Sequence, residues 1–339
     1  MTIASKPSST VDVSADPPSR AAVGVVVLNW NGWRDTIACL ESLIRASPSA
    51  SRVVVVDNAS RDDSMEQLVA WAENVGVELM TAREDERAAA TPRNFPAVTL
   101  IRSSWNRGFS GGCNVGLRFL ESAAELTHYL LLNNDATVAA DYFARVDDAL
   151  DAVPRAGLLC GTIFEGMPPS CRVWYAGGSS SPLRALVSHQ VEVPESAVPI
   201  PTSFITGCAM IISRDALATV GLMPECYFPA YMEDAEYSLR VRRAGFPAVY
   251  APRVLAYHKV GASLGVAAIR PAVVRAFNRH RAFYVRRNMT GWTRRAALAY
   301  LIVTKPARAA VEALRGRPRI GWAVLAGFVS GLFSKAADA

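Results

Sequence analysis

Short runs of β-branched, apolar residues recur along the first half of the chain, and a polar turn and a helical pattern follow each run. The runs are Val23 to Leu28, Arg52 to Val56, Val98 to Arg102 and His128 to Leu132. Runs of this length and composition are typical of parallel strands buried on both faces. Because a strand and helix repeat packs with its helices covering a sheet, the sequence predicts an α/β, doubly wound fold.

Polar residues stand where each of these strands is expected to end. Ligands of a doubly wound sheet bind beyond the carboxyl ends of its strands, so a site is expected at these turns. Asn, Asp, Gly and Ser are also the usual residues of tight turns, and one such turn alone is weak evidence. Four such turns, one after each strand at the same edge of the sheet, together predict hydrogen-bond donors and acceptors suited to a base, a ribose and a diphosphate. The segments are Asn29 to Gly32, Asp57 to Ser60, Asn106 to Asn114 and Asn133 to Asp135.

Two separated acidic positions indicate the chemistry. Asp135 ends the fourth polar turn, whereas Glu233 and Asp234 open a later helical segment. A carboxylate such as Asp135 can hold a divalent cation and, through it, a diphosphate. Asp234 is then free to take a proton from an incoming hydroxyl group. This division of roles predicts metal-assisted glycosyl transfer.

Seven short segments of this chain support the prediction of glycosyl transfer. They are Val27 to Gly32, Val56 to Ser60, Asn106 to Asn114, Leu132 to Asp135, Gly207 to Ile212, Glu233 to Asp234 and Tyr257 to His258. Together they resemble the family 2 glycosyltransferases of the GT-A fold, particularly the rhamnosyltransferase-like branch that builds bacterial surface polysaccharides. The resemblance covers residues 22–290 and implies a metal-dependent, inverting hexosyltransferase. It suggests dTDP-rhamnose as the first donor and a UDP-sugar as the second, with a saccharide or a lipid-linked glycan as acceptor.

The resemblance also implies roles for residues on the donor side. Asp57 would accept a hydrogen bond from the N3–H group of a pyrimidine base, although it could instead cap its own turn. The glycine-rich segment would let the backbone approach the ribose or the diphosphate. It matches neither the dinucleotide fingerprint nor the ATP phosphate loop, so NAD and ATP are not expected. The implied donor-binding residues are Asn29, Asn31, Asp57, Asn58, Asn106, Gly108, Phe109, Gly112, Asn114, Asn133 and Asn134.

Asp135 and His258 are the implied metal ligands. Asp135 stands where the family's DXD-type signature ends, and amide oxygens, which coordinate more weakly than carboxylates, occupy the two positions before it. His258 follows an expected strand, as the family's metal-binding His does, and the alternative for it is a hydrogen-bonded strand residue. An imidazole ligand favours Mn²⁺ over Mg²⁺ without deciding between them.

Asp234 is the expected general base, and inversion follows from back-side attack on the anomeric carbon. Glu233 is the second candidate, and either acid could instead be a helix N-terminal residue stabilised by about 0.5 kcal/mol. Gly207 and Cys208 are expected on the acceptor side, where Trp174 or Tyr231 could stack on a sugar ring, unless they belong to the core.

The C-terminal segment carries the positive charge. Residues 270–319 contain 13 Lys and Arg and the single acid Glu312, a balance of +12, whereas residues 1–269 have a balance of −6. Aromatic and aliphatic residues interleave with these arginines, which is typical of amphipathic helices rather than of nucleic-acid binding. We expect them to lie on a membrane surface or to pack on the catalytic domain or a second subunit. Arg279 and Arg286 share one helical face and could meet a diphosphate, or could be solvated.

These patterns predict a flexible lead-in over residues 1–21, a catalytic domain over 22–265 and a basic, amphipathic helical tail over 266–339. The donor half of the catalytic domain would be 22–153 and the acceptor half 154–265. Six cysteines without a C-x-x-C pair, and no signal peptide, favour a reduced, cytoplasmic setting on the inner face of the membrane. The sequence leaves open whether the chain forms a homo-oligomer.

Two other classes of protein remain as alternatives. A sugar-phosphate nucleotidyltransferase would share the sheet and the metal, but it calls for a basic residue in a glycine-rich loop after the first strand, where this chain has Asn29 to Gly32. A non-catalytic scaffold that binds carbohydrate or membrane would need neither Asp135 nor Asp234.

Overall fold

The structure is a computed structural model that describes residues 21–85, 97–166, 172–259 and 270–334. The predicted lead-in, apart from its last residue, lies outside this part of the chain. The strands are β1 (Val23–Asn29), β2 (Arg52–Asp57), β3 (Glu78–Arg83), β4 (Ala97–Arg102), β5 (His128–Asn133), β6 (Ala136–Val138), β7 (Leu158–Glu165), β8 (Arg172–Tyr175), β9 (Gly178–Ser181), β10 (Leu186–His189), β11 (Ile200–Pro201), β12 (Ala209–Ser213) and β13 (Ala248–His258).

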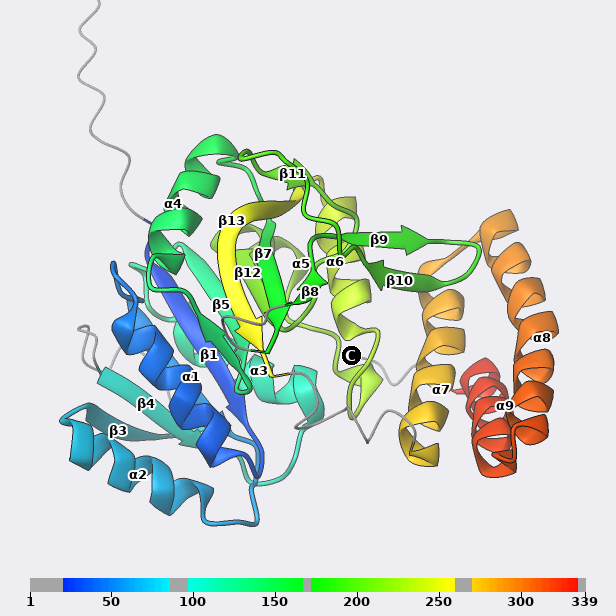
Figure 1. The fold of residues 1–339 in the computed structure, drawn as a ribbon, viewed down its shortest axis with the longest axis horizontal. Coiled ribbons are helices and arrows are strands. Elements are labelled where there is room, and N and C mark those ends of the chain that lie inside the picture. The colour runs from blue at the N-terminus through cyan, green and yellow to red at the C-terminus, as the bar shows by residue number, and fades with distance from the viewer. Residues whose placement is uncertain (1–20, 86–96, 167–171, 260–269, 335–339) are drawn as a thin grey trace, which may run out of the picture.

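One large sheet runs through the molecule in the order β11-β13-β7-β12-β5-β1-β2-β4-β3 (Figure 1). β6 pairs with β13 and β8 pairs with β7, whereas β9 and β10 form a separate hairpin. β5, β1, β2, β4 and β3 are parallel to one another, and β12 joins them in the antiparallel sense. The mixed α/β sheet is the predicted fold class, and the reversed strand β12 separates its parallel part from the β7–β13 part.

Helices cover the sheet and extend beyond it. They are α1 (Trp33–Arg45), α2 (Ser64–Val75), α3 (Gly108–Glu121), α4 (Tyr142–Ala152), α5 (Arg214–Val220), the 3-10 turn η2 (Glu225–Tyr227), α6 (Glu233–Arg243), α7 (Pro271–Asn288), α8 (Gly291–Leu314) and α9 (Pro318–Phe333). Valines of β1 and β2 pair in register, and all five residues Val53 to Asp57 are buried. Their burial between helical layers explains why these strands are apolar at successive positions.

The glycine-rich segment forms the body of α3 rather than a loop open to a ligand. A Cβ atom on Gly112 would lie 2.3 Å from Leu28 Cδ1, and one on Gly116 would lie 2.5 Å from Val26 Cγ1. These glycines therefore let the helix pack closely on β1. Gly108, the first residue of α3, is packed as well, since its Cβ would lie 2.7 Å from Pro229 O. This differs from the expectation that the segment brings backbone to the ribose or diphosphate.

The sequence also predicts a strand over residues 203–212 and a pair of strands around residues 248–258, and the structure differs from both predictions. The pair expected around residues 248–258 is the single strand β13, and its register against β7 shifts between Ala251 and Leu255, a stretch that includes Pro252. A proline cannot donate to the ladder, so the irregularity lies where the pairing must break. The strand expected to begin at Ser203 begins at Ala209, because the chain before it turns toward α6, where Ser238 Oγ accepts from Ile205 N at 3.1 Å.

The C-terminal segment consists of α7, α8 and α9, which lie together at the end of the molecule opposite α2 and β3 (Figure 1). A Cβ atom on Gly327 would lie 2.2 Å from the carbonyl oxygen of Arg275, and one on Gly331 would lie 2.2 Å from that of Arg279. Glycines four residues apart thus let α9 pack backbone to backbone against α7, in the parallel sense. Among the described helices, none has both the length and the apolarity needed to cross a bilayer.

Candidate active site

The turns after β1 and β2 are joined by a buried hydrogen-bond network. Asn29 Nδ2 donates to Asp57 Oδ1 at 2.8 Å and to Ser60 Oγ at 3.2 Å, and Ser60 N donates to Asp57 Oδ2 at 3.1 Å. Asn31, at φ 51°, accepts from Arg61 N at 2.7 Å. Asn29 and Asp57 are fully buried. They lie beneath the surface at this edge of the sheet. Both carboxylate oxygens of Asp57 already accept hydrogen bonds from the protein.

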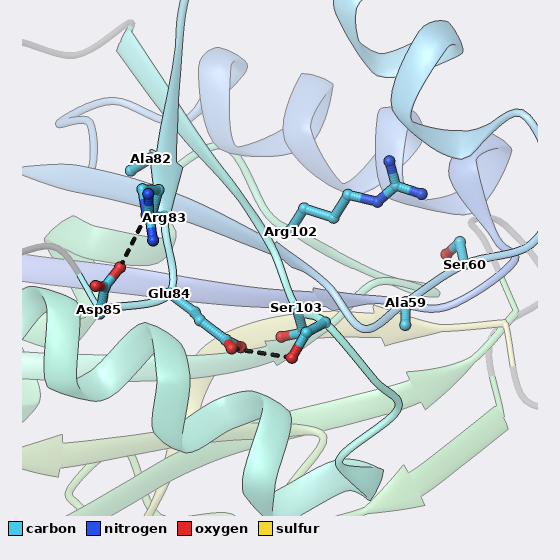
Figure 2. Close-up of a pocket in the computed structure, with 9 residues that line it drawn as sticks. Ala59, Ser60, Ala82, Arg83, Glu84, Asp85, Arg102 and Ser103 are labelled. Carbon is cyan, nitrogen blue, oxygen red and sulfur yellow. Dashed lines mark hydrogen bonds and ion pairs between the residues drawn. The ribbon is translucent and has the colours of Figure 1, made fainter.

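An open cavity of about 670 Å³ lies beside this network, at the carboxyl ends of β2, β3 and β4 (Figure 2). Ala59 and Ser60 line one side of it, and Arg83, Glu84 and Arg102 also line it. A cavity of this size, with donors and acceptors at its rim, suits a nucleoside. Its lining residues are Ala59, Ser60, Ala82, Arg83, Glu84, Asp85, Arg102, Ser103 and Ser104.

Sequence reasoning missed most of these lining residues. Arg102, Ser103 and Ser104 follow directly after an apolar run, so the rule that polar residues after each strand belong to the site points to them. The prediction instead assigned this part of the site to the glycine-rich segment that begins a few residues later. Glu84 follows β3, a half-exposed strand without the long apolar run of its neighbours.

Three of the predicted donor-binding asparagines hold protein segments together. Asn58 Nδ2 donates to Gly108 O at 3.0 Å, and Asn58 Oδ1 accepts from Arg107 N at 2.9 Å. Asn106 Oδ1 accepts from Gly108 N at 2.8 Å. Asn114 is 1 % exposed, donates to Met223 O at 2.9 Å and accepts from Met223 N at 3.0 Å. These contacts fix the start of α3, and Asn114 lies away from the sheet edge.

Asp135 and His258 meet as the sequence predicted for the metal ligands. His258 Nε2 lies 3.1 Å from Asp135 Oδ1, and the two side chains are 8 % and 7 % exposed. The pairing of β6 with β13, in which His258 lies opposite Ala136, brings them together across more than a hundred residues of sequence. Burial lowers the pKa of His258, but Cys208 and Asp135 outweigh it and raise the pKa to about 10. The carboxylate of Asp135 therefore stabilises positive charge on the His258 ring.

The surroundings of this pair fit a metal bound partly by its substrate. Within the described residues, no group of three or more His, Cys, Asp and Glu side chains could hold a metal ion. Asn134 Nδ2 donates to Gly32 O at 3.3 Å and to Thr36 Oγ1 at 3.0 Å, so it supports the turn. The half-buried Asn133 donates its backbone N–H to Cys208 O. A carboxylate and an imidazole would leave the other coordination positions to diphosphate and water oxygens.

The acidic pair lies at the start of α6. Asp234 Oδ2 accepts from Gly207 N at 3.2 Å, and Asp234 Oδ1 accepts from Ala235 N at 2.8 Å. Burial raises the pKa of Asp234 and outweighs these bonds. Glu233 is 5 % exposed, and burial and then the neighbouring charge of Asp234 raise its pKa. A half-buried carboxylate of raised pKa suits a general base.

The loop before α6 has an unusual backbone. Tyr231 and Met232 adopt left-handed conformations, at φ 85° and 78°, which residues other than glycine rarely take. His280 of α7 is fully buried, and its Nδ1 lies 3.0 Å from Ala230 O. Burial lowers the pKa of His280 to about 4, so it is neutral and donates to that carbonyl. α7 thus braces the loop that presents Asp234.

Gly207 and Cys208 connect the two acidic positions. Gly207 N donates to Asp234, and Cys208 O accepts from Asn133 N at 2.9 Å, two residues before the predicted metal ligand Asp135. A Cβ atom on Gly207 would lie 3.0 Å from the ring of Phe109, so this ring packs against the same segment. The predicted base and the predicted metal ligands therefore border one site.

The aromatic residues predicted for the acceptor side lie in different surroundings, Trp174 beside His258 and Tyr231 beside α7. Trp174 packs edge-on against His258, with ring centroids 4.7 Å apart, and against His189 at 4.3 Å. Tyr231 packs on Phe277 of α7 at 6.0 Å. Both are half-buried, so each has a surface left for a ligand.

The two arginines predicted to meet a diphosphate do not share one environment. Arg286 Nη1 donates to Ser334 O at 2.7 Å and to Gly331 O at 3.1 Å, at the end of α9. It caps that helix and is not directed to a ligand. Arg279 is exposed.

Comparison with known proteins gives a family and a fold. The model of the family described as "Glycosyl transferase family 2" matches residues 24–221. A search of curated proteins gave no match.

Solved structures with a similar fold include two transferases. One is GalNAc-T7 with UDP, GalNAc and Mn²⁺ (TM-score 0.58, 14 % identity), and the match covers 80 % of this chain and 48 % of that chain. The other is the mannosyltransferase PcManGT from Pyrobaculum calidifontis with GDP-Man and Mn²⁺ (TM-score 0.54, 19 % identity), covering 96 % of this chain and 90 % of that one. The chain thus spans about half the length of GalNAc-T7. These likenesses agree with the GT-A fold.

Proposed function

The chain belongs to glycosyl transferase family 2, and we propose that it is an inverting enzyme that transfers a sugar from a nucleotide-diphospho-sugar to a hydroxyl group of a saccharide or a lipid-linked glycan. The observation that supports this proposal is a pair of hydrogen bonds on one short segment: Gly207 N donates to Asp234, and Cys208 O accepts from the N–H of Asn133, two residues before Asp135. That arrangement puts a proton acceptor and a place for a diphosphate at one site.

The cavity at the ends of β2, β3 and β4 is the proposed nucleoside site. Ser60, Ser103 and Arg102 offer hydrogen-bond donors there. Asp57 accepts a hydrogen bond from Ser60 N and so holds the turn that lines the cavity. dTDP-rhamnose is the first donor to test, because of the resemblance of the sequence motifs, and a UDP-sugar is the second. With dTDP-rhamnose, the reaction would be a rhamnosyl transfer in the synthesis of surface polysaccharide.

Each residue of the site has a role in the proposed reaction. The acceptor hydroxyl loses its proton to Asp234 Oδ as its oxygen attacks the anomeric carbon from the side opposite the diphosphate. Gly207 N holds the carboxylate in position. Asp135 and His258 would hold Mn²⁺ or Mg²⁺, which stabilises the charge of the leaving diphosphate. Glu233 supports the base by keeping the start of α6 buried.

We place the reaction at the cytoplasmic face of the membrane, with the protein bound peripherally. The basic charge of residues 270–319 supports this location.

Donor binding with and without Mn²⁺ tests the proposed function. The purified protein is titrated with dTDP-rhamnose, UDP-glucose, UDP-galactose, UDP-N-acetylglucosamine and GDP-mannose, with binding followed by ligand-detected NMR. We expect one donor to bind in the presence of Mn²⁺ and to weaken by about tenfold or more in Asp135→Ala. Asp151→Ala, an exposed acid on α4, is the matched control. A folded protein that binds none of these donors would favour the scaffold reading.

A further inference from the structure

The outward side of α8 is an apolar stripe. Trp292, Ala299, Val303, Ala310 and Leu314 recur at intervals of seven and four residues, which places them on one face of a helix. All five are exposed, Trp292 at 79 %, Val303 at 71 % and Leu314 at 88 %. The opposite face holds the buried residues that pack inward. α8 also forms the edge of the molecule farthest from β3 (Figure 1).

α9 carries a second exposed stripe, made by Trp322, Val329 and Phe333. α9 is parallel to α7 and therefore antiparallel to α8, which returns along α7 after a two-residue turn. The two helices touch where a Cβ on Gly321 would lie 2.5 Å from Ala309 O. On α8 the contact residue Ala309 comes directly before the stripe residue Ala310, and on α9 the contact residue Gly321 comes directly before the stripe residue Trp322. Because the two right-handed helices are antiparallel, a step of one residue from the contact turns to the same side in both, so the two stripes lie on one side of the helix pair.

Arginines without an acidic partner adjoin this α8–α9 face. Within the described part of the chain, no ion pair involves Arg295 or Arg319, and both are exposed. Each stands three residues along its helix from a stripe tryptophan, Trp292 or Trp322, so it borders the stripe. By contrast, the buried Glu312 pairs with Arg308 at 2.7 Å and Arg317 at 2.9 Å. The charge that remains next to the apolar stripes is therefore positive.

We propose that the α8–α9 face binds the surface of an anionic lipid bilayer, with its stripes in the interface and its arginines at the lipid phosphates. A second copy of the chain fits this face less well, because two segments of balance +12 would be brought together. An anionic bilayer is complementary in charge, and tryptophans on both helices suit the boundary between headgroups and acyl chains. Because α7 packs on α9 and braces the Ala230 loop, this docking would hold the catalytic site near the bilayer.

Vesicle flotation tests this proposal without donor or acceptor, so its result is separate from that of the transferase proposal. The full chain is mixed with vesicles of phosphatidylcholine alone, or of equal parts phosphatidylcholine and phosphatidylglycerol. We expect flotation with the anionic vesicles only, and a loss of partitioning of about tenfold or more in the double variant Val303→Glu, Leu314→Glu. Val191→Glu, Val198→Glu is the matched control, because both of its sites are exposed valines in the loop before β11.

Circular dichroism of each variant checks that it folds, and Arg295→Gln, Arg319→Gln gives a second test that leaves the stripe intact. We expect that variant to bind anionic vesicles more weakly than the parent. Equal flotation of the parent and the stripe variant would overturn the proposal. So would a parent that floats with no vesicle and forms a dimer that Val303→Glu, Leu314→Glu dissociates, because the face would then be a subunit interface.

Discussion

At the scale of single residues, the environment of Asp234 determines its chemistry. Its carboxylate accepts hydrogen bonds from Gly207 N and Ala235 N, which favour the charged form, while burial disfavours it and has the larger effect. Glu233, the more deeply buried of the two, has its pKa raised further by this neighbour. The two adjacent acids are in different surroundings, so the pair loses its two protons in separate steps as the pH rises.

The pH dependence of transfer follows from this environment. A general base acts only when deprotonated, so kcat/KM should rise with pH through the raised pKa of Asp234 and level off above it. We expect the midpoint of this limb to lie above the usual aspartate range of about 4. Asp234→Asn should lower kcat by about 10²–10⁴-fold and remove the limb, while donor binding stays unchanged.

Asp215→Asn is the control for this prediction, because Asp215 is an exposed acid in the first turn of α5. A profile of pH against rate that keeps the same limb in Asp234→Asn would assign the base to another group.

At the scale of elements, glycines decide how the helices pack. Gly112 and Gly116 seat α3 on β1, and Gly327 and Gly331 seat α9 on α7. The sequence pattern predicts a ligand-binding segment for the first pair. The positions of the neighbouring atoms, side chains of β1 for α3 and backbone carbonyls of α7 for α9, show that both pairs serve close packing.

Gly331→Ala should loosen α9. Its Cβ would lie 2.2 Å from Arg279 O, and a backbone carbonyl cannot move aside as a flexible side chain can. We expect a loss of about 1–3 kcal/mol in the free energy of unfolding, measured with urea. Faster hydrogen exchange confined to α9 and the facing part of α7 would show where the packing fails. Ser330→Ala, one residue earlier on the same helix, should have a much smaller effect.

The parallel half of the sheet could be predicted from the sequence because its strands are buried on both faces, which leaves continuous apolar runs. β9 and β10 were missed, since this short hairpin lies outside the main sheet and is mostly half-exposed. In the site, Asp135 and His258 were found as a pair through the family motif, and the structure confirms that they meet. The direction of Arg286 and the role of Asn114 depend on segments distant in sequence, which no local pattern contains.

At the scale of the whole molecule, the C-terminal helices are joined to the catalytic part through Glu236. This carboxylate of α6 is fully buried and accepts from Tyr227 OH at 2.5 Å and from Asn288 Nδ2 at 2.7 Å. It also pairs with Arg240 and, at 3.0 Å, with Arg287 of α7. Burial alone would raise its pKa, but the hydrogen bonds and the arginines lower it. The helix that presents Asp234 is thus fixed to α7.

Removing this carboxylate should weaken both the fold and the reaction. Glu236→Ala leaves Arg287 and Asn288 without their acceptor, and we expect a loss of about 3–5 kcal/mol in the free energy of unfolding. Glu236→Gln keeps the shape and should lose less. Because the folded-state pKa is lowered, this stabilisation is present above the pKa of an unfolded glutamate and fades as pH falls through the folded value. The difference between the parent and Glu236→Gln in urea unfolding should therefore narrow from pH 7 to pH 3, which is below the usual glutamate range. A difference that stays constant would mean that Glu236 acts through packing and not through its charge.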